Sequence, residues 1–157
     1  MPLDLTKPID AQDFPTFPLY LRNVWIDNID PAYIVWNVFW SVTGTLVVGV
    51  NKSWELPILV DTSRTPTIVS VIARVKTAPT GASLIVDINK NGTTIFTSQS
   101  LRPTIAIAGV VSAQTTPNLV TIADGDNFTL DVDQVGSTIA GADLTVVMKL
   151  KQKVIYT

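Results

Sequence analysis

The 157-residue sequence contains no histidine and no cysteine. Without cysteine the chain forms no disulfide and no thiolate metal site. Without histidine it has no Ser-His-Asp or Cys-His catalytic set and no histidine-based zinc site. These absences remove the commonest nucleophilic and metal-dependent mechanisms. We therefore predict a protein that is not an enzyme and that holds no cofactor.

Charge is also scarce, because Asp, Glu, Lys and Arg make up only 15% of the residues while hydrophobic residues make up 46%. A free soluble monomer usually carries more surface charge, so a chain this apolar either buries most of itself or presents surface to partners. The formal net charge is −2, and basic residues cluster only in the alternation Lys149, Lys151, Lys153. Nucleic-acid binding needs a cationic face, so we predict no nucleic-acid partner.

Residues 31–51 carry no charge and are long enough to span a bilayer. Polar residues interrupt the stretch, its composition is β-branched, and no basic cluster flanks it. Gly44 stands where a turn between two strands would fall. We therefore predict two buried strands or an interface segment here instead of a spanning helix, and no membrane partner.

The beginning of the chain differs in composition from the rest. Nine of the twelve aromatic residues lie in positions 1–54, and five of the ten prolines lie in 1–31. Proline spaced in this way blocks helices and removes ladder donors, so we expect residues 1–20 to run extended. An extended, aromatic segment must lie against another surface. We predict an extended Pro- and aromatic-rich N-terminal arm over residues 1–45 and a β-sandwich over residues 46–157.

The rest of the chain reads as short strands separated by turns. Apolar residues alternate with polar ones in 67–76, 82–88, 127–135 and 142–156. The residues predicted to face the core are Val69, Val71, Ala73, Val75, Leu84, Val86, Ile88, Phe128, Leu130, Val132, Leu144, Val146, Met148 and Leu150. No helical period is present, so we predict an all-β, antiparallel β-sandwich whose sheets have one wet face.

The stretch "DINKNG" (87–92) has the D-x-N-x-N-G spacing of half an EF-hand calcium loop. The twelfth position of such a loop needs a bidentate acid, and here it is Ser98, between strand-like flanks. We predict a β-hairpin in which Asn91-Gly92 supplies the positive-φ positions, and no metal site. Asp87 and Asn89 would then project on the solvent face.

Five further aspartates are candidate acid-base residues or calcium ligands: Asp124, Asp126, Asp131, Asp133 and Asp143. Aspartate is common in turns for backbone reasons, and charge on an outward strand face discourages edge aggregation. We interpret these residues as structural and predict no catalytic residue.

Aromatic side chains are the candidate interface residues of the arm: Phe14, Phe17, Tyr20, Trp25, Tyr33, Trp36, Phe39 and Trp40. In "YIVWNVFW" (33–40) both alternating faces are apolar, as in a strand that is covered on both sides. The alternatives are core packing at one end of the sandwich, a subunit interface, and a platform for stacking carbohydrate. The sequence leaves core and interface open.

Residues 67–150 contain the phrases "TAPTGA…DINKNG", "ADGD…LDVDQVGS" and "GADLTV". As a set these phrases resemble a jelly-roll β-sandwich module of tailed-bacteriophage virion proteins. The module occurs in tail fibres, head fibres and capsid cement (decoration) proteins, and it carries no catalytic motif. The resemblance does not extend to residues 1–45.

The resemblance implies a structural virion protein, and we expect a capsid cement protein on the capsid exterior. Such a protein would bind the major capsid protein as a homotrimer and stabilise the shell, with the arm reaching the capsid protein or a neighbouring subunit. The chain lacks the long repetitive shaft of a complete fibre. The alternative is a tail-fibre or head-fibre receptor-binding module that holds a host surface glycan.

Overall fold

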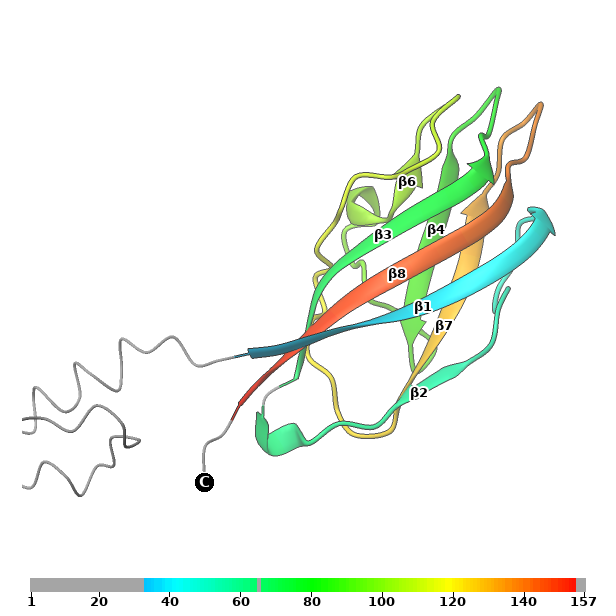
Figure 1. Ribbon diagram of the computed structural model, residues 1–157. Helices are drawn as coiled ribbons and strands as arrows, with labels where there is room; N and C mark the ends of the chain where they lie inside the picture. The colour runs from blue at the N-terminus through cyan, green and yellow to red at the C-terminus, as the bar shows by residue number, and fades with distance from the viewer. Residues whose placement is uncertain (1–32, 65, 155–157) are drawn as a thin grey trace, which may run out of the picture. The chain divides into compact units, whose positions relative to one another are not determined.

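The computed structural model describes residues 33–64 and 66–154. Two antiparallel sheets pack face to face (Figure 1). One sheet has the order β1 (Tyr33–Thr45), β8 (Ala142–Lys153), β3 (Thr67–Thr77). The other has the order β2 (Leu56–Ile58), β7 (Asp126–Gln134), β4 (Leu84–Lys90), β5 (Thr93–Thr94), and β6 (Thr104–Ile105) also pairs with β4. Two short 3₁₀ turns, Thr62–Arg64 and Gln99–Leu101, are the helical elements of the described residues, and neither is long enough to cross a membrane.

An irregular segment, residues 110–121, extends the first sheet beyond β3. Val71 and Thr115 exchange both backbone hydrogen bonds (2.8 and 2.9 Å), and the Val75 N–H donates to the Val110 carbonyl (2.9 Å). The described chain therefore passes back and forth between the two sheets, and β1 pairs with β8. This path is of jelly-roll type. The predicted jelly-roll β-sandwich is confirmed.

Strand β1 lies within the stretch assigned from the sequence to the arm. It pairs with β8 from Tyr33 opposite Lys153 to Val42 opposite Leu144. Gly44, with φ +79°, stands near its end, and the chain then crosses to the other sheet. Residues 33–45 are thus hydrogen-bonded into the sandwich, and the rest of the arm, residues 1–32, lies outside the described residues.

The core fills the space between the sheets. Of the fourteen residues predicted to face it, all are buried except Val69. A β-bulge between Ile68 and Ser70 shifts the alternation by one residue, so Ile68 lies in the core and Val69 is only half-buried. Each large side chain buried in this way contributes about 1.5–3 kcal/mol of hydrophobic stabilisation. In the part of the chain that the structure describes, the buried core residues lie between Trp40 and Leu150.

Candidate interaction surface

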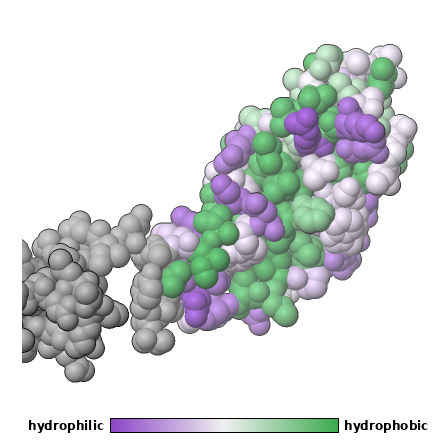
Figure 2. All heavy atoms as spheres, in the orientation of Figure 1, coloured by the Kyte–Doolittle hydropathy of each residue, from purple (hydrophilic) through white to green (hydrophobic). Residues whose placement is uncertain are grey.

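An apolar row crosses the outer side of the β1-β8-β3 sheet. The strand register places Phe39 opposite Val147, and Val147 opposite Ile72. Directly opposed residues share a face of the sheet, and their neighbours Trp40, Val146 and Ala73 point into the core. Phe39 is 56% exposed, and the other two members are half-buried. Figure 2 shows hydrophobic side chains gathered over the middle of this side of the molecule, with hydrophilic ones beside them.

Basic side chains flank the apolar row. They alternate with core residues along β8 and β3, and they are Lys149, Lys151, Lys153, Arg74 and Lys76. The acidic residue within these three strands is Asp143, at the start of β8. None of the five cations forms an ion pair with a carboxylate in the described part of the chain. We call the apolar row together with these five cations the basic face.

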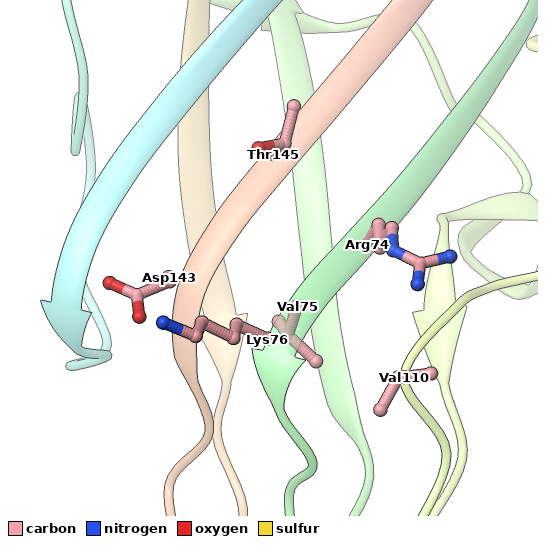
Figure 3. A pocket seen from close by; sticks show the side chains of 6 residues that line it. All are labelled: Arg74, Val75, Lys76, Val110, Asp143 and Thr145. Atoms are coloured by element: carbon pink, nitrogen blue, oxygen red, sulfur yellow. The ribbon is translucent and has the colours of Figure 1, made fainter.

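An open cleft of about 310 Å³ lies at one end of the basic face (Figure 3). It is lined by Arg74, Val75, Lys76, Val110, Asp143 and Thr145. In Figure 3 the Arg74 side chain extends toward Val110, and that of Lys76 extends to the other side, toward Asp143. The Asp143 carboxylate already accepts the Gly44 N–H at 2.8 Å. The balance of charge in this cleft therefore favours an anionic group.

The four predicted interface residues that the structure describes divide between core and surface. Trp40 is fully buried and Trp36 packs against the core, whereas Tyr33 and Phe39 are exposed on the outer side of β1. The Lys151 ammonium lies over the Tyr33 ring, and its Nζ is 4.9 Å from the centroid of that ring. The remaining predicted residues, Phe14, Phe17, Tyr20 and Trp25, lie outside the described residues.

Strand β1 lies at the edge of its sheet, and no other strand of the described residues pairs with its outer side. The Ser41 carbonyl accepts the Ser53 hydroxyl at 3.0 Å on the side away from β8. Backbone direction repeats every second residue, so the polar groups of Asn37 and Phe39 point to the same edge. Edge strands are usually blunted by charge or proline, and β1 contains neither. The Trp54 ring lies edge-on to the Phe39 ring, with their centroids 6.1 Å apart.

The hairpin prediction for "DINKNG" is confirmed. Asn91 and Gly92 have φ +50° and +79°, and the residues before and after them pair as β4 and β5. The Asn91 amide donates to Asp126 Oδ1 at 2.7 Å, and its carbonyl oxygen accepts the Asn127 N–H at 2.8 Å. The described residues contain no group of three or more acidic side chains placed to hold a metal ion.

Each of the five candidate aspartates accepts hydrogen bonds that stabilise the fold. Asp124 accepts from the Val60 N–H, Asp126 from the Ala123 N–H and the Asn91 amide, Asp131 from the Asn51 N–H and the Asn89 amide, Asp133 from Arg102, and Asp143 from the Gly44 N–H. Each of these carboxylates therefore links segments that lie apart in the sandwich.

The prediction that Asp87 faces solvent is wrong. Asp87 is 7% exposed, and the Thr94 hydroxyl donates to its Oδ1 at 2.8 Å. Burial raises the pKa of the Asp87 carboxyl; the Thr94 hydrogen bond opposes this, and the nearby Asp133 charge adds to it. The burial of Asp87 depends on the segment that follows β4. The alternation of residues within β4 gives no information about that segment.

Ile72 and Arg74 were not recognised as surface candidates from the sequence. The available signal was alternation along the strand. Ile72 and Arg74 alternate with the core residues of β3, as Val147 and the three lysines alternate with those of β8. Alternation alone places each set on the outer side of its own strand. The pairing of β3 with β8 is what brings the two sets together.

Phage capsid structures are among the solved structures to which the chain is similar. No protein-family model matches the chain, and no curated protein is significantly similar to it in sequence. The cyanophage Pam1 capsid asymmetric unit contains a chain with 19% identity and a TM-score of 0.49, over 79% of this chain and 87% of that one. The acid-stable capsid of Helicobacter pylori bacteriophage KHP30 contains a chain with 12% identity and a TM-score of 0.43, over 80% of this chain and 100% of that one. Both TM-scores lie below 0.5, so these likenesses do not establish the role of this chain.

Proposed function

We propose that this protein is a structural component of a bacteriophage virion, and that its role is that of a capsid cement protein. The sequence resemblance of residues 67–150 to phage virion modules supports a virion component. The basic face is the observation that carries the proposed binding role. It joins an apolar row that includes the exposed Phe39 with five cations that have no ion pair among the described residues, and it lies beside the uncharged edge of β1.

The proposed mechanism is attachment by many weak contacts. Apolar surface removed from water contributes roughly 25 cal/mol per Å². A homotrimer on the capsid exterior would present three copies of each contact, and closed symmetry then multiplies a modest individual affinity through avidity. Contacts of this kind with the major capsid protein would hold neighbouring capsid subunits together and stabilise the shell.

The N-terminal arm is proposed as the second part of this attachment. Phe14, Phe17, Tyr20 and Trp25 supply large apolar side chains, which are enriched at protein interfaces. Within the described residues 33–64 and 66–154, the buried core begins at Trp40. Deleting residues 1–30 should therefore leave a folded jelly-roll that binds purified capsids more weakly. Unchanged affinity of the truncated protein would exclude the arm from attachment.

The test of the proposed role is the position of this chain in purified particles. Hundreds of copies over the capsid shell, located by imaging of the intact particle, are the expected result. A few copies at the tail would overturn the cement role and support the alternative of a receptor-binding fibre module for a host glycan. Binding of the purified protein to capsids stripped of it would confirm the capsid as partner.

A further inference from the structure

We propose that the basic face binds the acidic N-terminal segment, residues 1–32, of a neighbouring copy of the same chain. The inference rests on the proposed attachment role, in which the segment reaches the capsid protein or a neighbouring subunit, and it assigns the basic face to the segment of a neighbouring copy. It concerns contacts between copies of this protein, so it is testable on the purified protein without any capsid.

Charge is divided unevenly along the sequence. Residues 1–32 contain two basic side chains (Lys7 and Arg22) and five acidic ones (Asp4, Asp10, Asp13, Asp27 and Asp30), and 2 − 5 gives a net charge of −3. The rest of the chain contains nine basic and eight acidic side chains, and 9 − 8 gives +1. The sum, −2, is the net charge of the whole chain. The segment and the sandwich are thus opposite in sign.

The positive charge of the sandwich is concentrated on the basic face. Three cations elsewhere, Arg64, Lys90 and Arg102, are each paired with an aspartate. Six other cations have no ion pair with a carboxylate among the described residues, and five of these six lie on the basic face. The carboxylate on this side of the sheet, Asp143, already accepts a hydrogen bond from the Gly44 N–H. The basic face is therefore complementary in charge to an acidic ligand.

The apolar part of the face fits the same segment. The row of Phe39, Val147 and Ile72 lies among the cations, and residues 1–32 carry four aromatic side chains among their aspartates. Five prolines in this segment remove backbone donors, so it is poorly suited to extend the sheet at the edge of β1. Side-chain contacts with the face of the sheet are therefore favoured over strand addition.

A neighbouring copy is favoured over the chain's own segment because of the sequence just before β1. Asp30 precedes Pro31, and a residue before proline is biased to extended backbone. Tyr33 begins β1 two residues later, at the end of the sheet where it pairs with Lys153. To bind its own basic face, the segment would have to turn back over the strand that it leads into, which the extended bias at Asp30 disfavours.

Two charge-reversed proteins test the inference. The face variant carries Lys149→Glu, Lys151→Glu and Lys153→Glu, and the segment variant carries Asp4→Lys, Asp10→Lys and Asp13→Lys. Self-association is measured by sedimentation velocity, and association between differently labelled chains by energy transfer. We expect the wild type to self-associate in a salt-sensitive way, and each variant alone to associate about tenfold more weakly, as three exposed ion pairs of ordinary strength predict.

Mixing the two variants is the decisive measurement. In a mixture the basic segment of one variant meets the acidic face of the other, and the acidic segment meets the intact basic face. Association between the two labelled variants should therefore return to within a few-fold of the wild type. A different pair of results would overturn the neighbour as partner. If mixing does not restore association, but a single chain that carries both sets of reversals associates as the wild type does, the segment binds its own face.

Controls separate this contact from general charge effects and from misfolding. Lys149→Glu and Lys52→Glu change the net charge equally, and among the described residues Lys52 is the cation outside the basic face that has no ion pair with a carboxylate. Only Lys149→Glu should weaken association. Wild-type association of both triple variants, or a monomeric wild type at every accessible concentration, would overturn the inference. A wild-type protein that self-associates as expected but does not bind capsids would instead count against the proposed function alone.

Discussion

Replacing Asp126 by asparagine should destabilise the sandwich by about 2–3 kcal/mol at pH 7, the usual loss for a hydrogen bond to a charged group. Asp126 is 7% exposed and joins two turns. Its Oδ1 accepts the Asn91 amide at 2.7 Å, and its Oδ2 accepts the Ala123 N–H at 2.8 Å and lies 3.4 Å from the Lys90 ammonium. Asparagine offers one acceptor oxygen, so one of these donors would face an NH₂ group and remain unpaired.

Asp124→Asn is the matched control for this substitution. Asp124 lies two residues earlier and is exposed, and its Oδ1 accepts a single hydrogen bond, from the Val60 N–H at 2.9 Å. The asparagine carbonyl keeps that bond, so we expect a change within about 0.5 kcal/mol. For a chain of this size a loss of 2–3 kcal/mol lowers the melting temperature by about 4–12 °C, which thermal unfolding followed by circular dichroism resolves easily.

The difference between wild type and Asp126→Asn should also depend on pH. Burial alone would raise the pKa of Asp126, but the Ala123 and Asn91 hydrogen bonds and the Lys90 charge outweigh it and lower that pKa. A lowered pKa in the folded state stabilises the protein above the ordinary aspartate pKa of about 3.9, and this stabilisation is lost as pH falls through the folded value. The gap should be full at pH 7 and should close below about pH 4. Equal melting temperatures for wild type and Asp126→Asn at pH 7 would refute the reasoning.

Three further predictions concern the same sheet. Asp87→Asn should raise the melting temperature at pH 7, because burial disfavours the charged carboxyl and the amide still accepts the Thr94 hydrogen bond; the increase should disappear below about pH 3.9, and an unchanged melting temperature at pH 7 would contradict it. Gly92→Ala should cost about 1 kcal/mol in urea unfolding, since φ is +79° and the added Cβ meets no atom within 4 Å; a neutral result would mean that the turn relaxes. Millimolar calcium, compared with chelator, should leave the melting temperature unchanged, and a clear rise would restore the EF-hand interpretation of the hairpin.

Sequence patterns predicted the structure correctly where the result depended on a single strand or turn. The alternation in β4, β7 and β8 predicted their core faces, because successive side chains of a strand point to opposite sides. The Asn91-Gly92 hairpin was predictable because few residue pairs adopt two consecutive positive-φ conformations. Val69 and Asp87 escaped the same reasoning, since a bulge reverses the alternation and a following segment covers the strand.

Strand β1 shows a second limit of local patterns. Its sequence is apolar on both faces, which predicted a cover on each side without saying which residues faced which. Pairing with β8 fixes the outcome, because it turns Trp40 into the core and leaves Phe39 on the outer side. The aromatic residues of β1 are therefore divided between the core side (Trp36 and Trp40) and the outer side (Tyr33 and Phe39).

The sequence by itself determined the class of fold, the residues that face the core in most strands, the hairpin at Asn91-Gly92 and the exclusion of histidine and cysteine chemistry. Only the tertiary structure decided that Phe39, Ile72 and Val147 form one row beside the lysines of β8. The physical reason is that these strands are joined by backbone hydrogen bonds between residues far apart in the chain. Backbone groups are nearly the same in every residue, so the pairing that builds the basic face leaves little trace in any short stretch of sequence.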